Sequence, residues 1–140
     1  MDEIVHTELI LGGQKSGKSR RAETLARDWL IAPNHHAVLI ATGVAYDSEM
    51  NARIARHQRD RAARVPGLKT VEEPVNLPQR LFQLSRPDTL IVIDCLTLWL
   101  TNCMMPATGP AMTFNEQQQL HDSLCRQIRE SVGPIAIVSN

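Results

Sequence analysis

The sequence is poor in several features that mark whole classes of proteins. Aromatic residues make up 4% of the 140 residues, which argues against the platforms on which nucleic-acid bases stack. Fifteen basic residues balance fifteen acidic ones, so no net charge attracts a nucleic acid or a membrane surface. No apolar run approaches the length of a membrane span, and no segment has the pattern of a signal peptide. We therefore expect a cytoplasmic protein without a nucleic-acid partner or a membrane span.

Cysteine is scarce as well, and its arrangement gives no metal-binding signal. The three cysteines, Cys95, Cys103 and Cys125, are an odd number at spacings that match no zinc site. Such a set, in a chain without secretory features, is typical of reduced thiols. We expect these thiols to be free and mostly buried.

Other residues that bind metals or ligands in many proteins are better explained here by exposure or packing. The histidines at 35–36 precede an apolar run, which predicts an exposed loop rather than a metal site. His121 is expected at the surface of a helix. Trp99 and the methionines at 104–105 are expected in the core, where such residues are most often found.

The chain is long enough for one domain with a core, and 43% of its residues are hydrophobic. Short apolar runs alternate with segments of helical periodicity. Strands are expected at residues 9–11, 37–42, 68–71, 89–94 and 135–139, and helices at 19–32, 48–64, 77–84, 96–105 and 115–131. This alternation predicts a single α/β domain over residues 1–140, with a mostly parallel sheet and helices on both faces. A ligand should lie beyond the carboxyl ends of its strands.

The strongest motif follows the first expected strand. Residues 12–19 read GGQKSGKS, which fits the phosphate-binding loop pattern G-x-x-x-x-G-K-[ST]. The glycines let backbone amides turn toward an anion, the lysine reaches the phosphates, and the final hydroxyl can ligate Mg²⁺. A helix that opens at Ser19 adds the favourable dipole of its N-terminus. The motif predicts a P-loop NTPase-like nucleotide site formed by Gly12, Gly13, Gln14, Lys15, Ser16, Gly17, Lys18 and Ser19.

Asp94 ends the clearest apolar strand of the chain, TLIVID. Downstream of a phosphate loop, an acidic residue in this position commonly binds Mg²⁺ directly or through water. The alternative is an aspartate that caps the next helix, which is expected to begin two residues later. The presence of the phosphate loop favours the metal interpretation, so we predict that Ser19 and Asp94 hold Mg²⁺.

The helix expected at 48–64 carries a basic ridge. Arg53, His57 and Arg61 are spaced four apart and therefore share one face, beside the apolar Ile54. A neutral imidazole between two guanidinium groups can attack a phosphorus atom while the arginines hold the phosphate oxygens. Composition and spacing alone, however, favour an ordinary solvated basic face.

Several short strings, taken together, resemble one protein family over nearly the whole chain and in the family's order. They are the phosphate loop, ATG at 41–43, EM and RI within 49–54, the histidine at 57, RDR at 59–61, TVEEP at 70–74, DCLTLWLTN at 94–102 and VSN at 138–140. Phosphate loops are widespread, whereas this combination is specific. The chain resembles the bifunctional adenosylcobinamide kinase/adenosylcobinamide-phosphate guanylyltransferase of cobalamin synthesis.

The resemblance implies roles for individual residues. His57 stands where the family's histidine becomes covalently guanylylated, just before an R-D-R-like segment. Contacts with the guanine nucleotide are implied for Ala41, Thr42, Gly43, Gln58, Arg59, Asp60, Arg61, Glu72 and Asp94. The implied partners are small molecules, namely ATP or GTP and adenosylcobinamide. A homo-oligomer, a trimer, is also implied.

The implied chemistry has two steps. A nucleoside triphosphate first phosphorylates the hydroxyl of adenosylcobinamide, aided by Lys18, Asp94 and Mg²⁺ bound to Ser19. His57 then attacks the α-phosphate of GTP, releases pyrophosphate and carries GMP to the cobinamide phosphate, which gives the GDP-cobinamide product.

The chain departs from the family's pattern in two places. The family continues past the S-N step with an E-V-G-like segment, a helix and a strand, so we expect a chain that lacks the family's C-terminal elements. Residues 62–68 replace a P-x-x-W-like stretch, so the assignment of Glu72 depends on the TVEEP match. Two other functions stay open: a different small-metabolite P-loop kinase, which needs no reactive His57, and a non-catalytic nucleotide-binding remnant.

Overall fold

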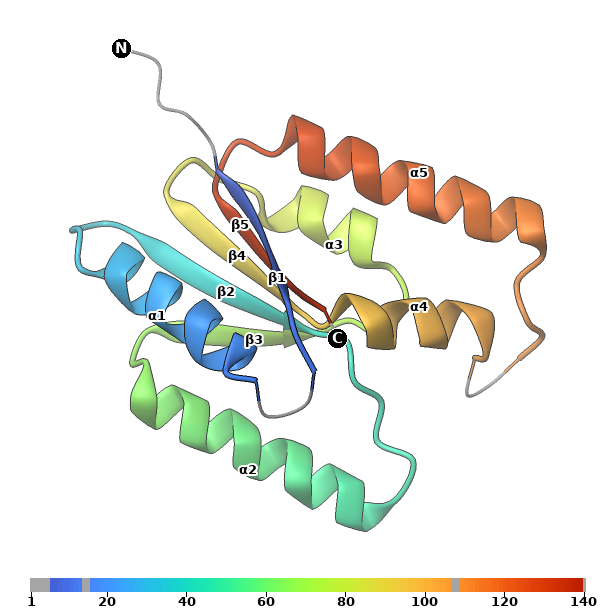
Figure 1. Cartoon of the computed structure of the whole chain (residues 1–140), viewed down its shortest axis with the longest axis horizontal. Helices are drawn as coiled ribbons and strands as arrows, with labels where there is room; N and C mark the ends of the chain where they lie inside the picture. Colours follow the sequence, from blue (N-terminus) through green and yellow to red (C-terminus); the bar gives the residue numbers. More distant parts are fainter. Residues whose placement is uncertain (1–5, 14–15, 107–108, 140) are drawn as a thin grey trace.

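The structure, a computed structural model, describes residues 6–13, 16–106 and 109–139. At its centre lies a five-stranded sheet in the order β1-β5-β4-β2-β3, in which each pair of neighbours is parallel (Figure 1). The strands are β1 (Thr7–Leu11), β2 (His36–Ala41), β3 (Leu68–Glu72), β4 (Thr89–Asp94) and β5 (Ile135–Ser139). The predicted α/β fold with a parallel sheet is confirmed.

Helices cover both faces of this sheet. They are α1 (Lys18–Leu30), α2 (Ser48–Arg64), α3 (Leu77–Leu84), α4 (Leu96–Met104) and α5 (Phe114–Glu130). Helix α1 packs on one face, and α3, α4 and α5 pack on the other. Helix α2 lies at the edge of the molecule near β3 (Figure 1).

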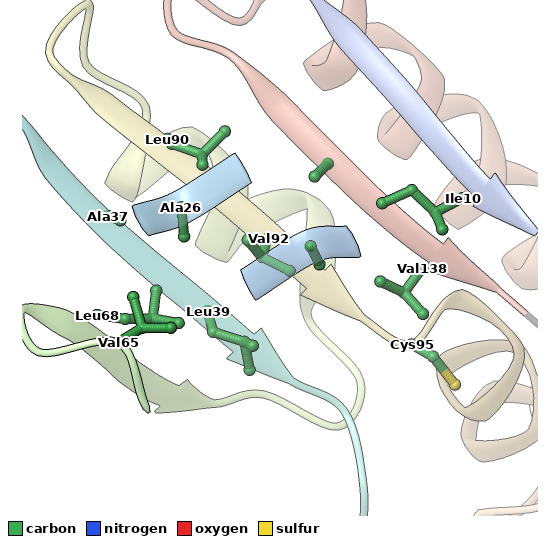
Figure 2. Packing of buried hydrophobic residues seen from close by; sticks show 12 residues of the cluster. Ile10, Ala26, Ala37, Leu39, Val65, Leu68, Leu90, Val92, Cys95 and Val138 are labelled. Atoms are coloured by element: carbon green, nitrogen blue, oxygen red, sulfur yellow. The ribbon is translucent and has the colours of Figure 1, made fainter. Parts of the chain in front are cut away.

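The core divides into two clusters because alternate side chains of a strand point to opposite faces. On β4, Leu90 and Val92 belong to the cluster under α1, and Ile91 and Ile93 belong to the cluster under the other three helices. Figure 2 shows Ala26 of α1 above the first cluster. Its small side chain lets the helix approach the sheet closely.

Two helix starts bear on the site. Helix α2 is capped by Asp47, whose Oδ1 accepts a hydrogen bond from the amide of Met50 at 2.7 Å. Helix α4 is capped by Cys95, whose Sγ accepts from the amide of Leu98 at 3.4 Å. Cys95 is therefore the cap of α4, and the alternative role of Asp94 as the cap of this helix is wrong.

Several expected surroundings are wrong. His121 is half-buried, with its ring edge-on to Trp99 at a centroid distance of 5.8 Å. His35 is also half-buried, and its ring stacks on Trp29 at 3.9 Å. The broad apolar faces of the two tryptophans explain both placements. The methionines at 104–105, expected in the core, are exposed at the end of the short helix α4.

The cysteines agree better with expectation. Cys95 and Cys103 are buried, Cys125 is exposed, and all three thiols are free. Among the described residues, no helix has both the length and the apolar character needed to cross a membrane. That part of the chain also holds no group of three or more histidine, cysteine or acidic residues that could bind a metal ion.

Candidate active site

The phosphate loop joins the carboxyl end of β1 to the start of α1. Gly17 is the N-cap of α1 and has a φ of 87°, in the left-handed region that favours glycine. A Cβ atom at Gly12 would collide with the side chain of Ser16, so a larger residue there would have to displace that side chain. Because Gly17 has no side chain to cap the helix, the first amides of α1 can bind an anion.

Lys18 is the first residue of α1, and its side chain folds back over the loop. Its Nζ donates a hydrogen bond to the carbonyl oxygen of Gly13 at 2.9 Å. An open hollow of about 300 Å³ lies here, lined by Ser16, Gly17, Lys18, Ser19 and Arg20. Gln14 and Lys15 lie outside the described residues. The described part of the loop thus combines a concave surface with a lysine at its centre.

A second hollow, of about 140 Å³, lies where β2, β3 and β4 end and α2 and α4 approach them. We call it the strand-end pocket. Its lining consists of Ala41, Gly43, Ile54, His57, Gln58, Arg61, Glu72, Asp94 and Leu98. All of these except Ile54 and Leu98 are residues for which the sequence predicted a nucleotide contact or a catalytic role. The fold therefore brings together residues that lie between positions 41 and 98 of the chain.

Asp94 is the electrostatic centre of this region. Its side chain is 26% exposed. The side chain of Arg61 is 15% exposed and places Nη2 at 3.8 Å from Oδ2 of Asp94. Burial raises the pKa of Asp94, and the positive charges of Arg61 and Lys18 partly counteract that rise. The carboxylate thus lies within electrostatic reach of both the phosphate loop and α2, which links the two hollows.

Helix α2 has no buried residue and contacts the rest of the protein largely through polar side chains. Its inner face carries Gln58, Arg61 and Arg64, spaced three apart, which meet acidic residues of three different elements. The pairs are Gln58 Nε2 with Glu72 Oε1 at 3.1 Å, Arg61 with Asp94 at 3.8 Å, and Arg64 Nη2 with Glu23 Oε1 at 2.7 Å. His57 is exposed next to this row and faces the strand-end pocket.

Some predicted site residues are placed differently. Arg53, Arg59 and Asp60 are exposed on α2 and line neither the loop hollow nor the strand-end pocket. Thr42 is fully buried, and its hydroxyl is hydrogen-bonded to the backbone of Cys95. A nucleotide contact by Thr42, Arg59 and Asp60 stays a prediction from the resemblance, and the exposed Arg53 fits the solvated basic face that its spacing favours.

Sequence reasoning missed Leu98 as a pocket residue. It is an exposed apolar side chain on α4, at the wall of the strand-end pocket. The segment around it is apolar on nearly every side, so no local pattern indicates which leucine is left uncovered. Ile54 was placed correctly on the inner side of α2 but was not assigned to the site.

Comparison with known proteins identifies the family. Residues 8–140 match the family described as cobinamide kinase / cobinamide phosphate guanyltransferase. The bifunctional adenosylcobalamin biosynthesis protein CobP of Pseudomonas aeruginosa is 41% identical over 133 residues, which cover 95% of this chain and 70% of that protein. The CobU proteins of Escherichia coli and Salmonella typhimurium are 33% and 37% identical over 101 residues. In both cases the match covers 72% of this chain and 51% of the relative, so the chain spans about half the length of these two proteins. The chain belongs to the cobinamide kinase / cobinamide phosphate guanyltransferase family.

Proposed function

We propose that this protein carries out two linked reactions: phosphorylation of adenosylcobinamide by a nucleoside triphosphate, then transfer of GMP from GTP through a guanylylated His57 to give adenosylcobinamide-GDP. The position of His57 beside Asp94 and Arg61 in the strand-end pocket carries this proposal. A kinase needs the phosphate loop and an acidic metal ligand. Of the two reactions, only the covalent transfer of GMP needs a nucleophilic histidine.

The kinase step uses the phosphate loop and Asp94. The ammonium group of Lys18 can turn from the Gly13 carbonyl to the β- and γ-phosphates and stabilise their negative charge. Ser19 and Asp94 present a hydroxyl and a carboxylate, which are the oxygen ligands that Mg²⁺ prefers, so these residues fit the ion and would hold it. When bound, Mg²⁺ neutralises charge on the phosphates. The loop amides orient the γ-phosphate toward the hydroxyl of the acceptor.

The transfer step begins at His57. Its neutral imidazole attacks the α-phosphorus of GTP, a P–N bond forms, the P–O bond to pyrophosphate breaks, and the other ring nitrogen gives up its proton. His57 is exposed, so a nucleotide can reach it. Arg61 has a buried nitrogen, Nη1, that lacks a hydrogen-bond partner among the described residues, so its guanidinium has donors left for phosphate oxygens. An oxygen of the cobinamide phosphate then attacks the same phosphorus, and the imidazole leaves.

Incubation of the protein with α-labelled GTP and Mg²⁺ tests the proposal. We expect label to remain on the denatured protein and to be released in acid, because P–N bonds are acid-labile. His57→Asn should abolish this capture, because asparagine has no nucleophilic nitrogen, while γ-phosphoryl transfer from ATP largely survives. His36→Asn is the matched control, because His36 is exposed at the opposite end of β2 from the pocket.

The other outcomes identify the competing functions. Phosphorylation of a small molecule without covalent GMP would support a different P-loop kinase. Nucleotide binding without any turnover would support a non-catalytic module. Acid-labile GMP on the His57 variant would show that the nucleophile is wrongly assigned.

The family resemblance supports two further proposals. We infer that the protein works in the cytoplasm and that it forms a homo-oligomer, a trimer. Sedimentation velocity of the purified protein measures the number of copies directly.

A further inference from the structure

Thr42, the first residue after β2, is fully buried and all of its polar groups are engaged. Its amide donates to the carbonyl of Asp94 at 3.0 Å. Its hydroxyl donates to the carbonyl of Cys95 at 2.7 Å and accepts from the amide of Cys95 at 2.9 Å. Its own carbonyl accepts from Asn102 at 2.7 Å. Thr42 therefore grips the backbone on either side of the Asp94–Cys95 bond and has no group left for a ligand.

Asn102 connects this hydrogen-bond network to the end of a third strand, β3. It lies on α4, is buried, and uses one amide nitrogen, Nδ2, for two hydrogen bonds. These bonds reach the carbonyl of Thr42 at 2.7 Å and the carbonyl of Pro74 at 3.0 Å. Thr42 follows β2 and Pro74 follows β3, so one side chain of α4 joins the ends of two neighbouring strands.

The anchoring points lie next to the pocket in the chain. Thr42 precedes Gly43, Cys95 follows Asp94, and Pro74 lies two residues after Glu72. Gly43, Asp94 and Glu72 all line the strand-end pocket. A shift of the anchored backbone would therefore move three walls of the pocket relative to one another.

We propose that Thr42 and Asn102 are positioning residues that hold the carboxyl ends of β2, β3 and β4 in the arrangement needed for nucleotide transfer. Thr42 acts on Asp94 through the backbone of Cys95, and Asn102 acts through Thr42 and Pro74. The inference rests on the proposed function in that the strand-end pocket is taken as the nucleotide site. It assigns to Thr42 a role behind the pocket instead of the direct contact that the family resemblance implies.

A substitution that keeps the shape of Thr42 isolates this role. Thr42→Val replaces the hydroxyl with a methyl group of similar size. It leaves the amide of Cys95 without its partner and the carbonyl of Cys95 with only the amide of Trp99, at 3.3 Å. Thr42→Ser keeps the hydroxyl and removes only the methyl group. The contrast between the two variants therefore reports the hydrogen bonds and not the volume.

Asn102→Asp provides a second variant at the other end of the network. The carboxylate has nearly the shape of the amide but no hydrogen to donate, and it would face the carbonyl oxygens of Thr42 and Pro74. Thr101→Val is its control. The Thr101 hydroxyl donates only along α4, to the carbonyl of Thr97 at 3.0 Å, so its loss leaves the strand ends in place.

The test measures the rate of GMP capture from α-labelled GTP at saturating nucleotide and Mg²⁺, with circular dichroism to verify folding. Thr42→Val and Asn102→Asp should capture GMP about 10- to 100-fold more slowly, which is the usual effect of residues that orient a catalytic carboxylate. Thr42→Ser should recover most of the rate. Leu124→Ala is a control for stability, because it creates a cavity in the core beneath α5. It should lower the melting temperature without slowing GMP capture at a temperature where the variant is folded.

A capture rate for Thr42→Val equal to that of the unchanged protein overturns the inference. So does a loss that Leu124→Ala reproduces at equal stability, because the network would then matter only for folding. If the unchanged protein captures no GMP, the proposed function fails. The positioning role of Thr42 is then tested by equilibrium binding of a fluorescent GTP analogue to the two Thr42 variants. Weaker binding by Thr42→Val than by Thr42→Ser supports it, and equal binding by the two overturns it.

Discussion

The pair formed by Glu23 and Arg64 offers a quantitative test of how α2 is held in place. Arg64, the last residue of α2, donates from Nε to Oε2 of Glu23 at 3.0 Å and from Nη2 to Oε1 at 2.7 Å. The Glu23 side chain is 9% exposed and that of Arg64 is 41% exposed. Because α2 buries no residue of its own, this two-point contact is one of its main attachments. Glu23→Gln keeps the shape but removes the charge and one acceptor.

The size of the effect follows from the geometry. A hydrogen bond to a charged group contributes about 1.5–3 kcal/mol when it is well shielded. Arg64 is more than a third exposed, so water reduces this contribution, and we expect Glu23→Gln to lower the free energy of unfolding by about 1–2 kcal/mol. For a domain of this length, that corresponds to a fall in melting temperature of roughly 4–8 °C.

The effect should depend on pH with a definite sign. The hydrogen bonds from Arg64 lower the pKa of Glu23, against the opposing effect of burial. A carboxyl group whose pKa is lowered by folding stabilises the protein above its unfolded pKa, and this stabilisation is lost as the pH falls through the folded pKa. The difference between the unchanged protein and Glu23→Gln should therefore be full at pH 7 and shrink in acid, below the ordinary glutamate value of about 4.3.

Urea unfolding at a series of pH values measures this difference, and Glu8→Gln is the matched control. Glu8 pairs with Arg21 at 2.9 Å, but both side chains are exposed, so its loss should lower the stability much less than Glu23→Gln does. Equal losses for the two variants at pH 7 would refute the reasoning, because the shielding of Glu23 would then be irrelevant. If Glu23→Gln lowers the free energy of unfolding by the same amount in acid as at pH 7, the charge of Glu23 is not the cause of the loss.

Two further predictions concern the phosphate loop and Asp94. Lys18→Ala should abolish phosphoryl transfer from ATP and weaken triphosphate binding by about 10-fold or more, because a charge-assisted contact is lost. The circular dichroism spectrum should stay unchanged. Triphosphate affinity and turnover equal to those of the unchanged protein would refute the loop assignment. Asp94→Asn should abolish turnover yet raise the urea midpoint at pH 7 in EDTA, because burial raises the pKa of the carboxyl and its ionised form is unfavourable in the folded protein. The gain should shrink as the pH falls and Asp94 takes up a proton; a lower midpoint at pH 7 would contradict this account.

The elements were predictable because their limits are set by neighbours in the sequence. Strands β4 and β5 and helices α2 and α3 begin and end at the expected residues, and the limits of the other elements shift by at most two positions. Pro78 in the first turn of α3 and the Asp47 cap of α2 are local signals that act whatever the tertiary structure. The phosphate loop is local in the same sense, so its residues could be named before the fold was known.

The misplaced side chains share a different cause. His121 and His35 were assigned from their own segments, but their surroundings are set by tryptophan side chains whose reach is a property of the folded chain. The network of Thr42 and Asn102 was likewise invisible, because its hydrogen bonds join residues 53 and 60 positions apart. Polar residues buried in an apolar string are the available signal, and Asn102 in the segment 94–102 is such a residue.

The burial of Asp94 connects these observations. A carboxylate at the end of a buried strand is unfavourable in the folded protein, and Arg61 at 3.8 Å compensates only in part, since the pKa of Asp94 is still raised. Such a charge resists displacement only if the backbone that carries it is fixed, and the Thr42 hydrogen bonds fix the Asp94–Cys95 peptide and the carbonyl of Cys95. A partly buried carboxylate held in a rigid frame attracts an incoming cation more strongly than a solvated one, because the lower local dielectric screens the two charges less. The buried Asp94 carboxylate therefore costs stability, and the hydrogen bonds of Thr42 and Asn102 hold the strand ends that carry it in place.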